Sequence, residues 1–526
     1  MHDCVVQTRT ANRHMMWLNC GVVCLGMSAV LYRLSLTVAD PDLWGHVKFG
    51  KDIWQTGKII QNDPYSYLTA GQVWINHEWL AELGFYMVFA LGGAFALILF
   101  KTAMSLMIAG IIYRHLFRQG LSPIRAGIVL MLVTFMLIPA LITVRPQMFT
   151  YLFFLLLLLA IHGIEHGRTH MLWGGPLLFA IWANLHGGFL AGLGVYLLWS
   201  LVHITFLMLQ ARSRGIPPSL PILALVVAVI SSVLATLLNP YGIQLFVFLL
   251  RTATVPRPEI SEWQPIVIMS LWGAVYLILL AVTLIGLVYS RRESSPARLV
   301  IISCAALLPL IALRHGPLFA LAIAVLAAEH IGDAWERWSP SRLPSQRFGD
   351  GWRLRPWLAG LSLLGAIVLA GLSLPNFRCI RLDPRLGGSY PVRAIALLKQ
   401  SGVSGNLAVH FDWGEYALWH LSPRIKVSLD GRRETIYSDE IYRENSEFRQ
   451  GTGDWDALLR KRDTQLALVS RMFPVFNLMK LEPGWFLIYE DPLSGLFIRK
   501  GSRLAEEIKR IGLPALPYDG SALCFP

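Results

Sequence analysis

Long apolar runs recur along the first three quarters of the chain, and few charged residues interrupt them. Each run is close to the roughly 20 residues that a helix needs to cross a hydrocarbon core about 30 Å thick. We therefore predict a polytopic α-helical membrane protein with about eleven transmembrane helices. The runs cover approximately residues 16–38, 93–115, 123–142, 147–164, 170–185, 188–210, 218–238, 268–289, 298–313, 315–331 and 356–376.

A further apolar segment, residues 79–91, is too short to cross a membrane. Glu78 and Glu82 stand at its start, and Gly92-Gly93 follows its end. We expect this segment to form a helix that lies along the outer interface of the membrane. It would belong to a long first outer loop, residues 39–92.

The pattern changes after residue 376. Short β-like runs alternate there with helix-like runs, which predicts a small soluble α/β domain. We therefore divide the chain into a transmembrane domain, residues 1–376, and a C-terminal domain, residues 377–526. The β-like runs are 406–411, 465–470, 484–490 and 495–499, and the helix-like runs are 392–400, 441–449 and 455–460.

Basic residues are distributed unevenly between alternate loops. One set of loops holds sixteen arginines, whereas the other set, which is longer in total, holds seven lysines and arginines. Cytoplasmic loops are enriched in these residues, so the N-terminus is predicted to be cytoplasmic. An odd number of spans then places the C-terminal domain on the periplasmic, or extracytoplasmic, side. A signal peptide cleaved after Ala39 is the alternative for the first run, and it would move no later loop.

Composition agrees with a membrane protein and limits its partners. Hydrophobic residues make up 55% of the chain and charged residues only 15%, against about 25% in soluble domains. The net charge is +13, and the arginines that contribute to it are concentrated in the loops predicted to be cytoplasmic. We therefore expect membrane lipids, and no nucleic acid, as partners. The six cysteines have no metal-ligand spacing; a disulfide between Cys379 and Cys524 is left open.

Polar residues that suit a binding site fall on one predicted side of the membrane. An ionised group at bilayer depth is costly, so such residues at helix ends usually line a wet cavity. We predict a polar cavity at the outer boundary of the membrane as the functional site. The residues are Asp40, Asp42, His46, Asn76, His77, Glu78, Arg145, Gln147, Asn184, His186, Asn239, Glu262, Arg314 and His315.

Each of these residues also has a purely structural interpretation. Asp40 before Pro41 is a good helix start. Asn184 and His186 would pair with backbone at a helix end, and Arg145 and Arg314 would anchor helices at the interface. The C-terminal domain contains a polar cluster with the same two interpretations. It is either a surface turn or a binding site for an acceptor, in which Trp413 would stack on a sugar. That cluster is Asp412, Trp413, Asp430 and Arg432.

The order of these motifs resembles the GT-C superfamily of glycosyltransferases that use lipid-phosphate-linked sugars. A membrane helix is followed by an acidic Asp-Pro-Asp-Leu-Trp loop, an interfacial helix, further membrane helices and an outer soluble domain. The similarity is greatest to a bacterial set with motifs like 40–46, 76–80, 145–147, 184–189 and 239–242. C-terminal segments like 413–416 and 430–432 belong to the same pattern. Members of that set often have a second Trp where this chain has Gly45.

The resemblance implies an inverting glycosyltransferase that moves a sugar from a polyprenyl-phosphate donor to a glycan, lipid or protein acceptor. Asp40 or Asp42 would be the general base, and Arg145, Arg314 and His315 would bind the donor phosphate. A divalent metal ion is an open choice of cofactor. Its candidate ligands are Asp42, His46, His77 and Glu78.

Two other functions stay open at this point. A transporter of a lipid-linked substrate would need ionisable residues in mid-membrane and repeated halves, and the sequence has neither. A non-catalytic assembly or scaffold protein would keep the architecture without the chemistry. The expected location in every case is the inner (plasma) membrane of a bacterial cell envelope.

Overall fold

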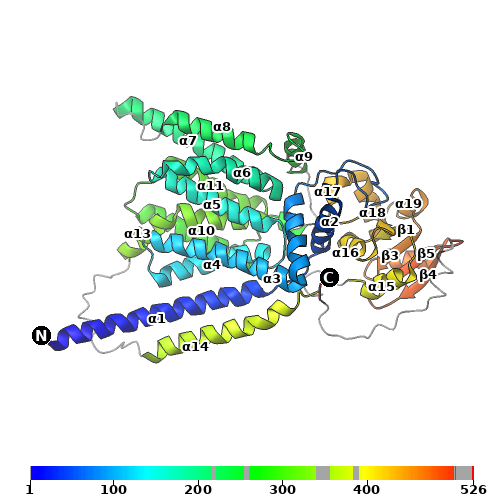
Figure 1. The fold of residues 1–526 in the computed structure, drawn as a ribbon, viewed down its shortest axis with the longest axis horizontal. Helices are drawn as coiled ribbons and strands as arrows, with labels where there is room; N and C mark the ends of the chain where they lie inside the picture. The colour runs from blue at the N-terminus through cyan, green and yellow to red at the C-terminus, as the bar shows by residue number, and fades with distance from the viewer. Residues whose placement is uncertain are drawn as a thin grey trace. The chain divides into compact units, whose positions relative to one another are not determined.

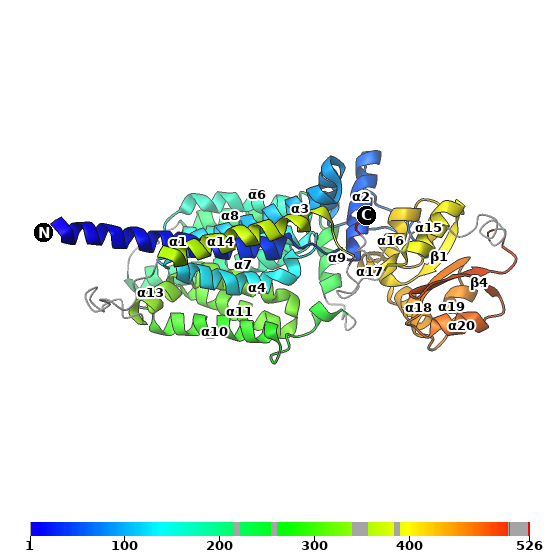
Figure 2. The same cartoon turned by 90° about the horizontal axis from the view of Figure 1, so that it is seen from below.

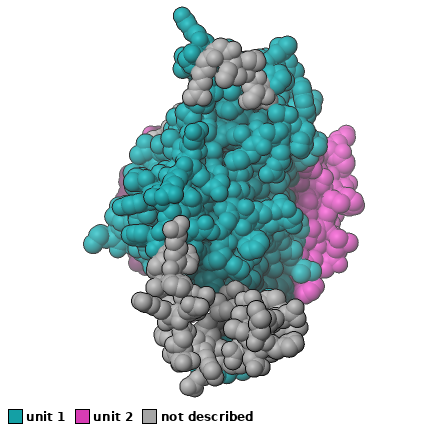
Figure 3. Space-filling view, turned by 90° about the vertical axis from the view of Figure 1, so that its left-hand side faces the viewer, with its two compact units in different colours: residues 1–37, 98–243, 255–378 teal, residues 38–97, 244–254, 379–526 magenta. Residues whose placement is uncertain are grey.

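The computed structural model describes residues 2–214, 221–253, 260–338, 356–382, 390–502, 504 and 524–526. The chain divides into two compact units, coloured separately in Figure 3. Unit 1 comprises Met1–Thr37, Ile98–Ile243 and Val255–Arg378, and unit 2 comprises Val38–Leu97, Gln244–Thr254 and Cys379–Pro526. The first loop thus belongs to the same unit as the C-terminal segment.

Unit 1 is a bundle of helices that lie side by side in both ribbon views (Figures 1 and 2). Helix α14 lies beside the C-terminal part of the longer helix α1. The helices of unit 1 are α1 (His2–Ser35), the second part of α3 (Trp79–Arg118), α4 (Pro123–Leu141), α5 (Gln147–Glu165), α6 (Gly174–Leu185), α7 (Phe189–Arg214), α8 (Ile222–Ala235), α10 (Leu271–Tyr289), α11 (Pro296–Ile311), α12 (Gly316–Leu326), α13 (Ala328–Trp338) and α14 (Pro356–Ser373).

Six helices of the described residues are long and apolar enough to cross a membrane. A bent pair, Leu313–Leu326 with Ala328–Trp338, would be a seventh span if counted as one. Each predicted apolar run contains a helix, but α8, for example, has only 14 residues, which is about 21 Å of rise. The chain therefore has the helices of a membrane protein, and the count of eleven spans stays a prediction.

The predicted break after residue 91 is confirmed. The helical run α3 is interrupted at Gly92 and Gly93, which have non-helical dihedral angles. Gly93 has a φ of 60°, a left-handed conformation that glycine adopts at no steric cost. The residues of α3 up to Leu97 belong to unit 2, and those from Ile98 belong to unit 1.

Unit 2 contains a five-stranded sheet with the strand order β2-β1-β3-β5-β4. β1 is parallel to β2 and β3, whereas β5 is antiparallel to β3 and β4. The strands are β1 (Gly405–Val409), β2 (Ile425–Val427), β3 (Leu466–Ser470), β4 (Trp485–Glu490) and β5 (Ser494–Arg499). The helices are α2 (Asp42–Thr56), the first part of α3, α9 (Gln244–Ala253), α15 (Val392–Ser401), α16 (Phe411–Leu421), α17 (Arg433–Ile436), α18 (Asp439–Gln450), α19 (Ala457–Arg460) and α20 (Val475–Leu481).

The predicted C-terminal strands and helices are all present. One strand and three helices went unpredicted: β2, α16, α17 and α20. β2 is only three residues long, and no alternation of polarity is readable over that length. Cys379 and Cys524 form a disulfide across a sequence separation of 145, which resolves the choice that the sequence left open.

A buried guanidinium holds the first loop against the C-terminal segment within unit 2. Arg432 Nη2 donates to Asp430 at 2.7 Å, and Arg432 Nη1 donates to Asp63 of the loop at 2.9 Å. The Arg432 side chain is 4% exposed and both carboxylates are fully buried. Loop aromatic rings surround the guanidinium at 4.7–5.3 Å from their centroids: Phe49, Tyr65 and Trp74. We call this set of ion pairs the Arg432 clasp.

Removing the guanidinium should destabilise unit 2 strongly. Arg432→Met leaves Asp430 and Asp63 buried without their cation, and breaking a buried pair in this way costs about 3–5 kcal/mol. The free energy of unfolding, followed by tryptophan fluorescence in detergent, measures the effect. The matched control is Arg460→Met, because Arg460 pairs with Asp454 and Asp456 at the exposed surface and its loss should have little effect. Equal effects of the two substitutions would contradict the clasp.

Candidate functional site

The acidic residues of the first loop meet acidic residues of the C-terminal segment inside unit 2. Asp40 is buried, and one of its carboxylate oxygens accepts a hydrogen bond from the Asp42 backbone N–H at 2.9 Å. This bond lies just before α2, whose N-cap position is Pro41 and not Asp40. Asp42, the first residue of α2, is only partly buried. The two carboxylates therefore differ in their access to a ligand.

Gly45 allows the carboxylate of Glu415 to approach the backbone of α2. The Gly45 N–H donates to Glu415 Oε2 at 3.0 Å. A Cβ at position 45 would lie 2.1 Å from that oxygen, so no other residue fits without displacing Glu415. Where the two-Trp pattern has its second Trp, this chain has Gly45, and the carboxylate of Glu415 occupies the space of the missing side chain.

Asp42 and Glu415 are close neighbours beside Gly431. A Cβ on Gly431 would lie 2.6 Å from an oxygen of each carboxylate. Burial raises the pKa of Glu415 well above its usual range, and the charges of Asp42 and Asp430 raise it further against the opposing effect of Arg432. Burial and the neighbouring carboxylates therefore favour the protonated form of Glu415.

Two further groups adjoin this acidic pair. Burial raises the pKa of Asp412, and the nearby charge of Asp40 adds to the effect while Arg449 opposes it. Burial raises the pKa of Tyr390 too, together with the charges of Asp40, Asp412, Asp42 and Glu415. The buried Tyr390 hydroxyl has no hydrogen-bond partner among the described residues. We call Asp40, Asp42, Asp412, Glu415 and Tyr390 the acidic cluster.

His46 lies on α2 next to two glutamates at the start of α3. Its Nδ1 is 3.5 Å from Glu82 and 3.9 Å from Glu78. Burial opposes a charge on the ring, but the hydrogen bond to Glu82 and the charges of Glu78, Glu82 and Asp42 outweigh it and raise the pKa of His46 to about 9. Single ligand atoms of these three residues lie within 4.8 Å of one another, a spacing that suits a metal ion.

The neighbours of His46 support its position. Asn76 Nδ2 donates to Glu82 at 2.5 Å and so fixes that carboxylate. His77 contacts Glu78 at 3.7 Å. Burial and the charge of His46 lower the pKa of His77 to about 4, so the His77 ring is neutral at pH 7. Of the four metal candidates named from sequence, His46 and Glu78 share this group, and Glu82 replaces Asp42 and His77 in it.

Unit 1 contains a separate pocket that is lined by cationic residues. Arg145, Gln147, Glu262 and Arg314 line it, with about 580 Å³ of unfilled space that includes open solvent. Arg145 lies 3.7 Å from Glu262, and the Arg314 guanidinium stacks 4.1 Å from the centre of the Trp263 ring. Four of the predicted cavity residues therefore come together here. We call this the arginine pocket.

Other predicted residues satisfy the backbone instead of a cavity. Asn184 Nδ2 donates to the carbonyls of Ala180 and Leu238 at 2.8 Å each. The His186 ring bonds to Thr150 at 2.7 Å and accepts from the Gly188 N–H at 3.0 Å. Asn239 accepts from the Tyr241 N–H and donates to the Thr236 carbonyl. His315 follows Arg314 in the chain but does not line the arginine pocket.

The predicted C-terminal residues divide between two roles. Asp412 belongs to the acidic cluster, whereas Asp430 and Arg432 form the clasp. Trp413 is 5% exposed and packs edge-on to His410, so the structure does not present its face to a sugar. Sequence reasoning missed Glu415 and Tyr390. Glu415 follows Trp413-Gly414 in a segment noted for resemblance, but Tyr390 has no recognisable motif.

Comparisons with known proteins bear on the fold. No known protein family and no curated protein sequence matches the chain. The oligosaccharyltransferase of Archaeoglobus fulgidus in its apo form is similar in structure, with a TM-score of 0.54, 14% identity, and coverage of 87% of this chain and 69% of that one. The chain has a GT-C fold. The predicted resemblance to that superfamily is thereby confirmed at the level of the fold.

Two more solved structures are similar to this chain. The same oligosaccharyltransferase, tethered to an acceptor peptide with an NVT sequon, gives a TM-score of 0.52 at 14% identity and the same coverage. ArnT from Cupriavidus metallidurans, bound to undecaprenyl phosphate, gives 0.49 at 12% identity and covers 90% of this chain and 97% of ArnT. At these identities the likeness concerns the fold, and the residues of the site must be argued from their own geometry.

Adding a methyl group at position 45 should displace Glu415. Gly45→Ala is expected to cost about 1–3 kcal/mol of stability, the range for overpacking a buried site. Gly84→Ala is the matched control, since no atom lies within 4 Å of its Cβ position. The double variant Gly45→Ala/Glu415→Ala has no clash, because the carboxylate is absent. Its loss of stability should therefore be smaller than the sum of the losses in the two single variants. Additive costs in unfolding measurements would show that the two positions do not touch.

The protonated state of Glu415 predicts a pH-dependent stability. Because its folded-state pKa is raised, its favourable contribution is complete below the usual glutamate value of about 4.3 and is lost as pH rises through the raised value. Glu415→Gln keeps a neutral acceptor for the Gly45 N–H, so its stability relative to wild type should increase with pH. Melting temperatures across the pH range measure this difference, with Glu482→Gln as a control outside the cluster. A difference independent of pH would contradict a neutral Glu415.

Proposed function

We propose that the chain is an inverting membrane glycosyltransferase that moves a sugar from a polyprenyl-phosphate donor to an acceptor at the outer face of the membrane. The GT-C fold and the apolar helices support a membrane glycosyltransferase in general. The observation that carries this proposal is the acidic cluster, in which the partly exposed Asp42 lies beside the buried Glu415, whose pKa is raised.

Asp42 is a better general base than Asp40 in this arrangement. Asp40 is buried, and one of its oxygens accepts the N–H that starts α2. Asp42 is partly exposed at the first turn of α2. A general base must reach the proton that it removes, and an accessible carboxylate can do so.

The reaction is a single displacement at C1 of the donor sugar. Asp42 takes the proton from a hydroxyl or amine of the acceptor as that atom attacks C1. The bond between C1 and the phosphate oxygen breaks, and its electron pair leaves with the polyprenyl phosphate. A phosphate is a weak base, so no general acid is needed, and inversion at C1 follows from the single attack.

Negative charge that develops on the leaving phosphate needs cationic groups. We assign this role to Arg145 and Arg314 of the arginine pocket. Glu262 approaches Arg145 only at 3.7 Å and is 41% exposed, so a phosphate can replace it at little cost. Gln147 lines the same pocket, and its buried Oε1 has no partner among the described residues.

A divalent metal ion fits the His46 group. His46, Glu78 and Glu82 would hold it, because one ligand atom of each lies within 4.8 Å of the other two. When bound, such an ion would supply positive charge for phosphate oxygens. Without it, the same residues fix α2 to the start of α3 through the ion pairs of His46.

We also propose the orientation derived from the arginines, with a cytoplasmic N-terminus and a periplasmic C-terminal domain, residues 377–526, in a bacterial inner membrane. The disulfide between Cys379 and Cys524 supports this, because disulfides persist in oxidising compartments.

Turnover of polyprenyl-phosphate sugars by the purified protein in lipid tests the proposal. Asp42→Asn should retain donor binding and lose roughly 10²–10⁴-fold in sugar transfer or release, the contribution of a general base. Asp40→Asn should lose less, because an amide oxygen still accepts the Asp42 N–H. The surface substitution Asp439→Asn is the control.

The reverse order of effects would assign the base to Asp40. Failure of wild type to bind any polyprenyl-phosphate sugar, with all variants folded, would reject the glycosyltransferase and favour a scaffold role.

A further inference from the structure

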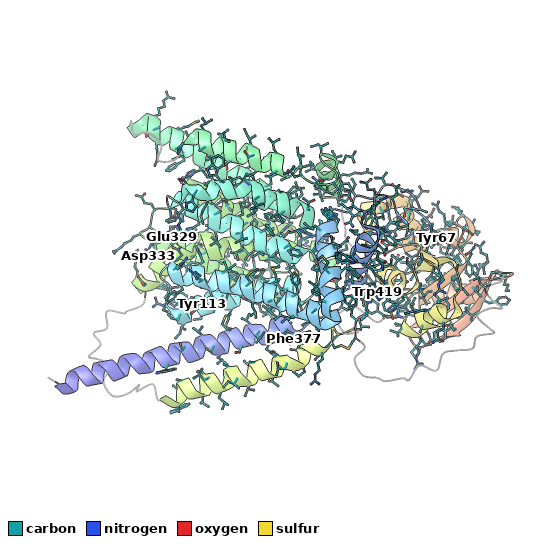
Figure 4. All side chains as sticks on the ribbon, viewed as in Figure 1. Tyr67, Tyr113, Glu329, Asp333, Phe377 and Trp419 are labelled. Atoms are coloured by element: carbon teal, nitrogen blue, oxygen red, sulfur yellow. A yellow bond between two sulfur atoms is a disulfide. The ribbon has the colours of Figure 1, made fainter. Side chains whose placement is uncertain are left out.

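Two histidines and a glutamate gather at the end of unit 1 where α5 finishes. His162 lies in the last turn of α5, His166 caps that helix, and Glu329 begins α13. Figure 4 shows Glu329 at the end of the bundle, near Asp333 of the same helix. One ligand atom of each of the three residues lies within 4.8 Å of the other two. This group is distinct from the His46 group, which belongs to unit 2.

His166 is oriented as a metal ligand would be. Its Nδ1 lies 2.7 Å from the carbonyl oxygen of His162 and must donate its proton there, since a carbonyl only accepts. In the neutral ring the lone pair is then on Nε2, which faces Glu329 Oε2 at 3.4 Å. A lone pair and a carboxylate repel each other unless a cation lies between them. The distance matches the separation of two ligands around a tetrahedral zinc ion, about 3.3 Å for bonds of 2.0–2.1 Å.

His162 likewise has one nitrogen occupied and one available. Its Nε2 accepts a hydrogen bond from the side-chain amide nitrogen of Gln119 at 3.0 Å, so a metal ion at Nδ1 would require the amide to turn its oxygen toward an Nε2–H. Its Nδ1 is buried and has no hydrogen-bond partner among the described residues, and the whole residue is only 3% exposed. The ring lies 4.1 Å from that of His166, measured between centroids. With its amide oxygen turned to the Nε2–H, Gln119 would be the second-shell partner of a metal-binding His162.

The third side chain is fixed by ion pairs. Arg298 Nη1 binds Oε1 of Glu329, and Oε2 faces both His166 at 3.4 Å and the half-exposed Arg292 at 3.6 Å. The same guanidinium binds Glu165 at 2.6 Å, and Glu165 also accepts from Trp199 Nε1 at 2.9 Å. Two buried carboxylates therefore offset the charge of Arg298 and part of the charge of an added cation.

We propose that His162, His166 and Glu329 bind a divalent transition-metal ion of the zinc class, which ties α5 to α13. Histidines four residues apart on one helix present both rings on the same side, and a glutamate from another helix completes a three-ligand site. Two nitrogens and one oxygen favour zinc, cobalt or nickel over magnesium and calcium, which prefer oxygen alone. The fourth position is left for water.

Cobalt binding to the full chain tests this site. The purified protein, stripped of metal by a chelator, is titrated with Co²⁺, whose visible absorption reports four-coordinate nitrogen and oxygen ligation. All proteins also contain Glu78→Gln, which removes a ligand of the His46 group. His166→Ala is the main variant, because its ring is 38% exposed and its loss should not disturb folding. His170→Ala is the matched control at a nearby exposed histidine.

We expect one equivalent of Co²⁺ in the parent protein and in His170→Ala, and affinity at least about 100-fold weaker in His166→Ala. Gln119→Leu should weaken binding by roughly 10–100-fold, the effect of removing a second-shell partner. Equal binding by the parent and His166→Ala, or no binding by the parent, would overturn the proposal and leave His166 as a structural neighbour of Glu329 only. Sugar transfer is measured separately with Asp42→Asn, so the two proposals can fail independently.

Discussion

The Arg432 clasp is the interaction on which the candidate site depends. Moving a charged group out of water costs several kcal/mol per ion, and the cost is recovered only while every partner stays in place. Arg432, Asp430 and Asp63 are all buried, and Asp63 comes from the first loop. The loop therefore cannot leave the C-terminal segment without exposing or orphaning these charges. This constraint fixes α2, and with it Asp42, beside α16 and Glu415.

Two glycines then determine how near the carboxylates can come. Gly45 lets Glu415 reach the backbone of α2, and Gly431 leaves space for both Asp42 and Glu415. Such proximity of two carboxylates disfavours ionising both, and burial raises the pKa of Glu415. Asp42 is the member of the pair that solvent can reach. Structural packing and the protonation state of the site are consequences of the same close approach.

Local sequence patterns predicted the helices and strands of this fold, but they did not predict the contacts between them. Apolar runs located the helices, Gly92-Gly93 located the break in α3, and alternating polarity located most strands of the sheet. Pairing of Gly45 with Glu415, or of Asp63 with Arg432, joins positions more than 350 residues apart and leaves no local pattern. Because residues were grouped by the predicted side of the membrane, the predicted cavity included Asn184, His186 and Asn239. The side chains of these residues form hydrogen bonds with nearby backbone groups. Side of the membrane alone cannot separate a cavity residue from a helix cap, because both occur at helix ends.

Arginine illustrates the difference between a structural and a ligand-binding role in one chain. Arg432 is held by two buried carboxylates at 2.9 Å or less, and an incoming anion would have to displace a fully desolvated partner. Arg145 faces Glu262 at 3.7 Å, and that carboxylate is 41% exposed; such a pair contributes at most about 1 kcal/mol. Arg314 stacks on Trp263, which orients the guanidinium through one face and leaves its charge intact. The pair of Arg145 with Glu262 can therefore exchange partners at little cost, whereas Arg432 cannot be recruited without dismantling unit 2.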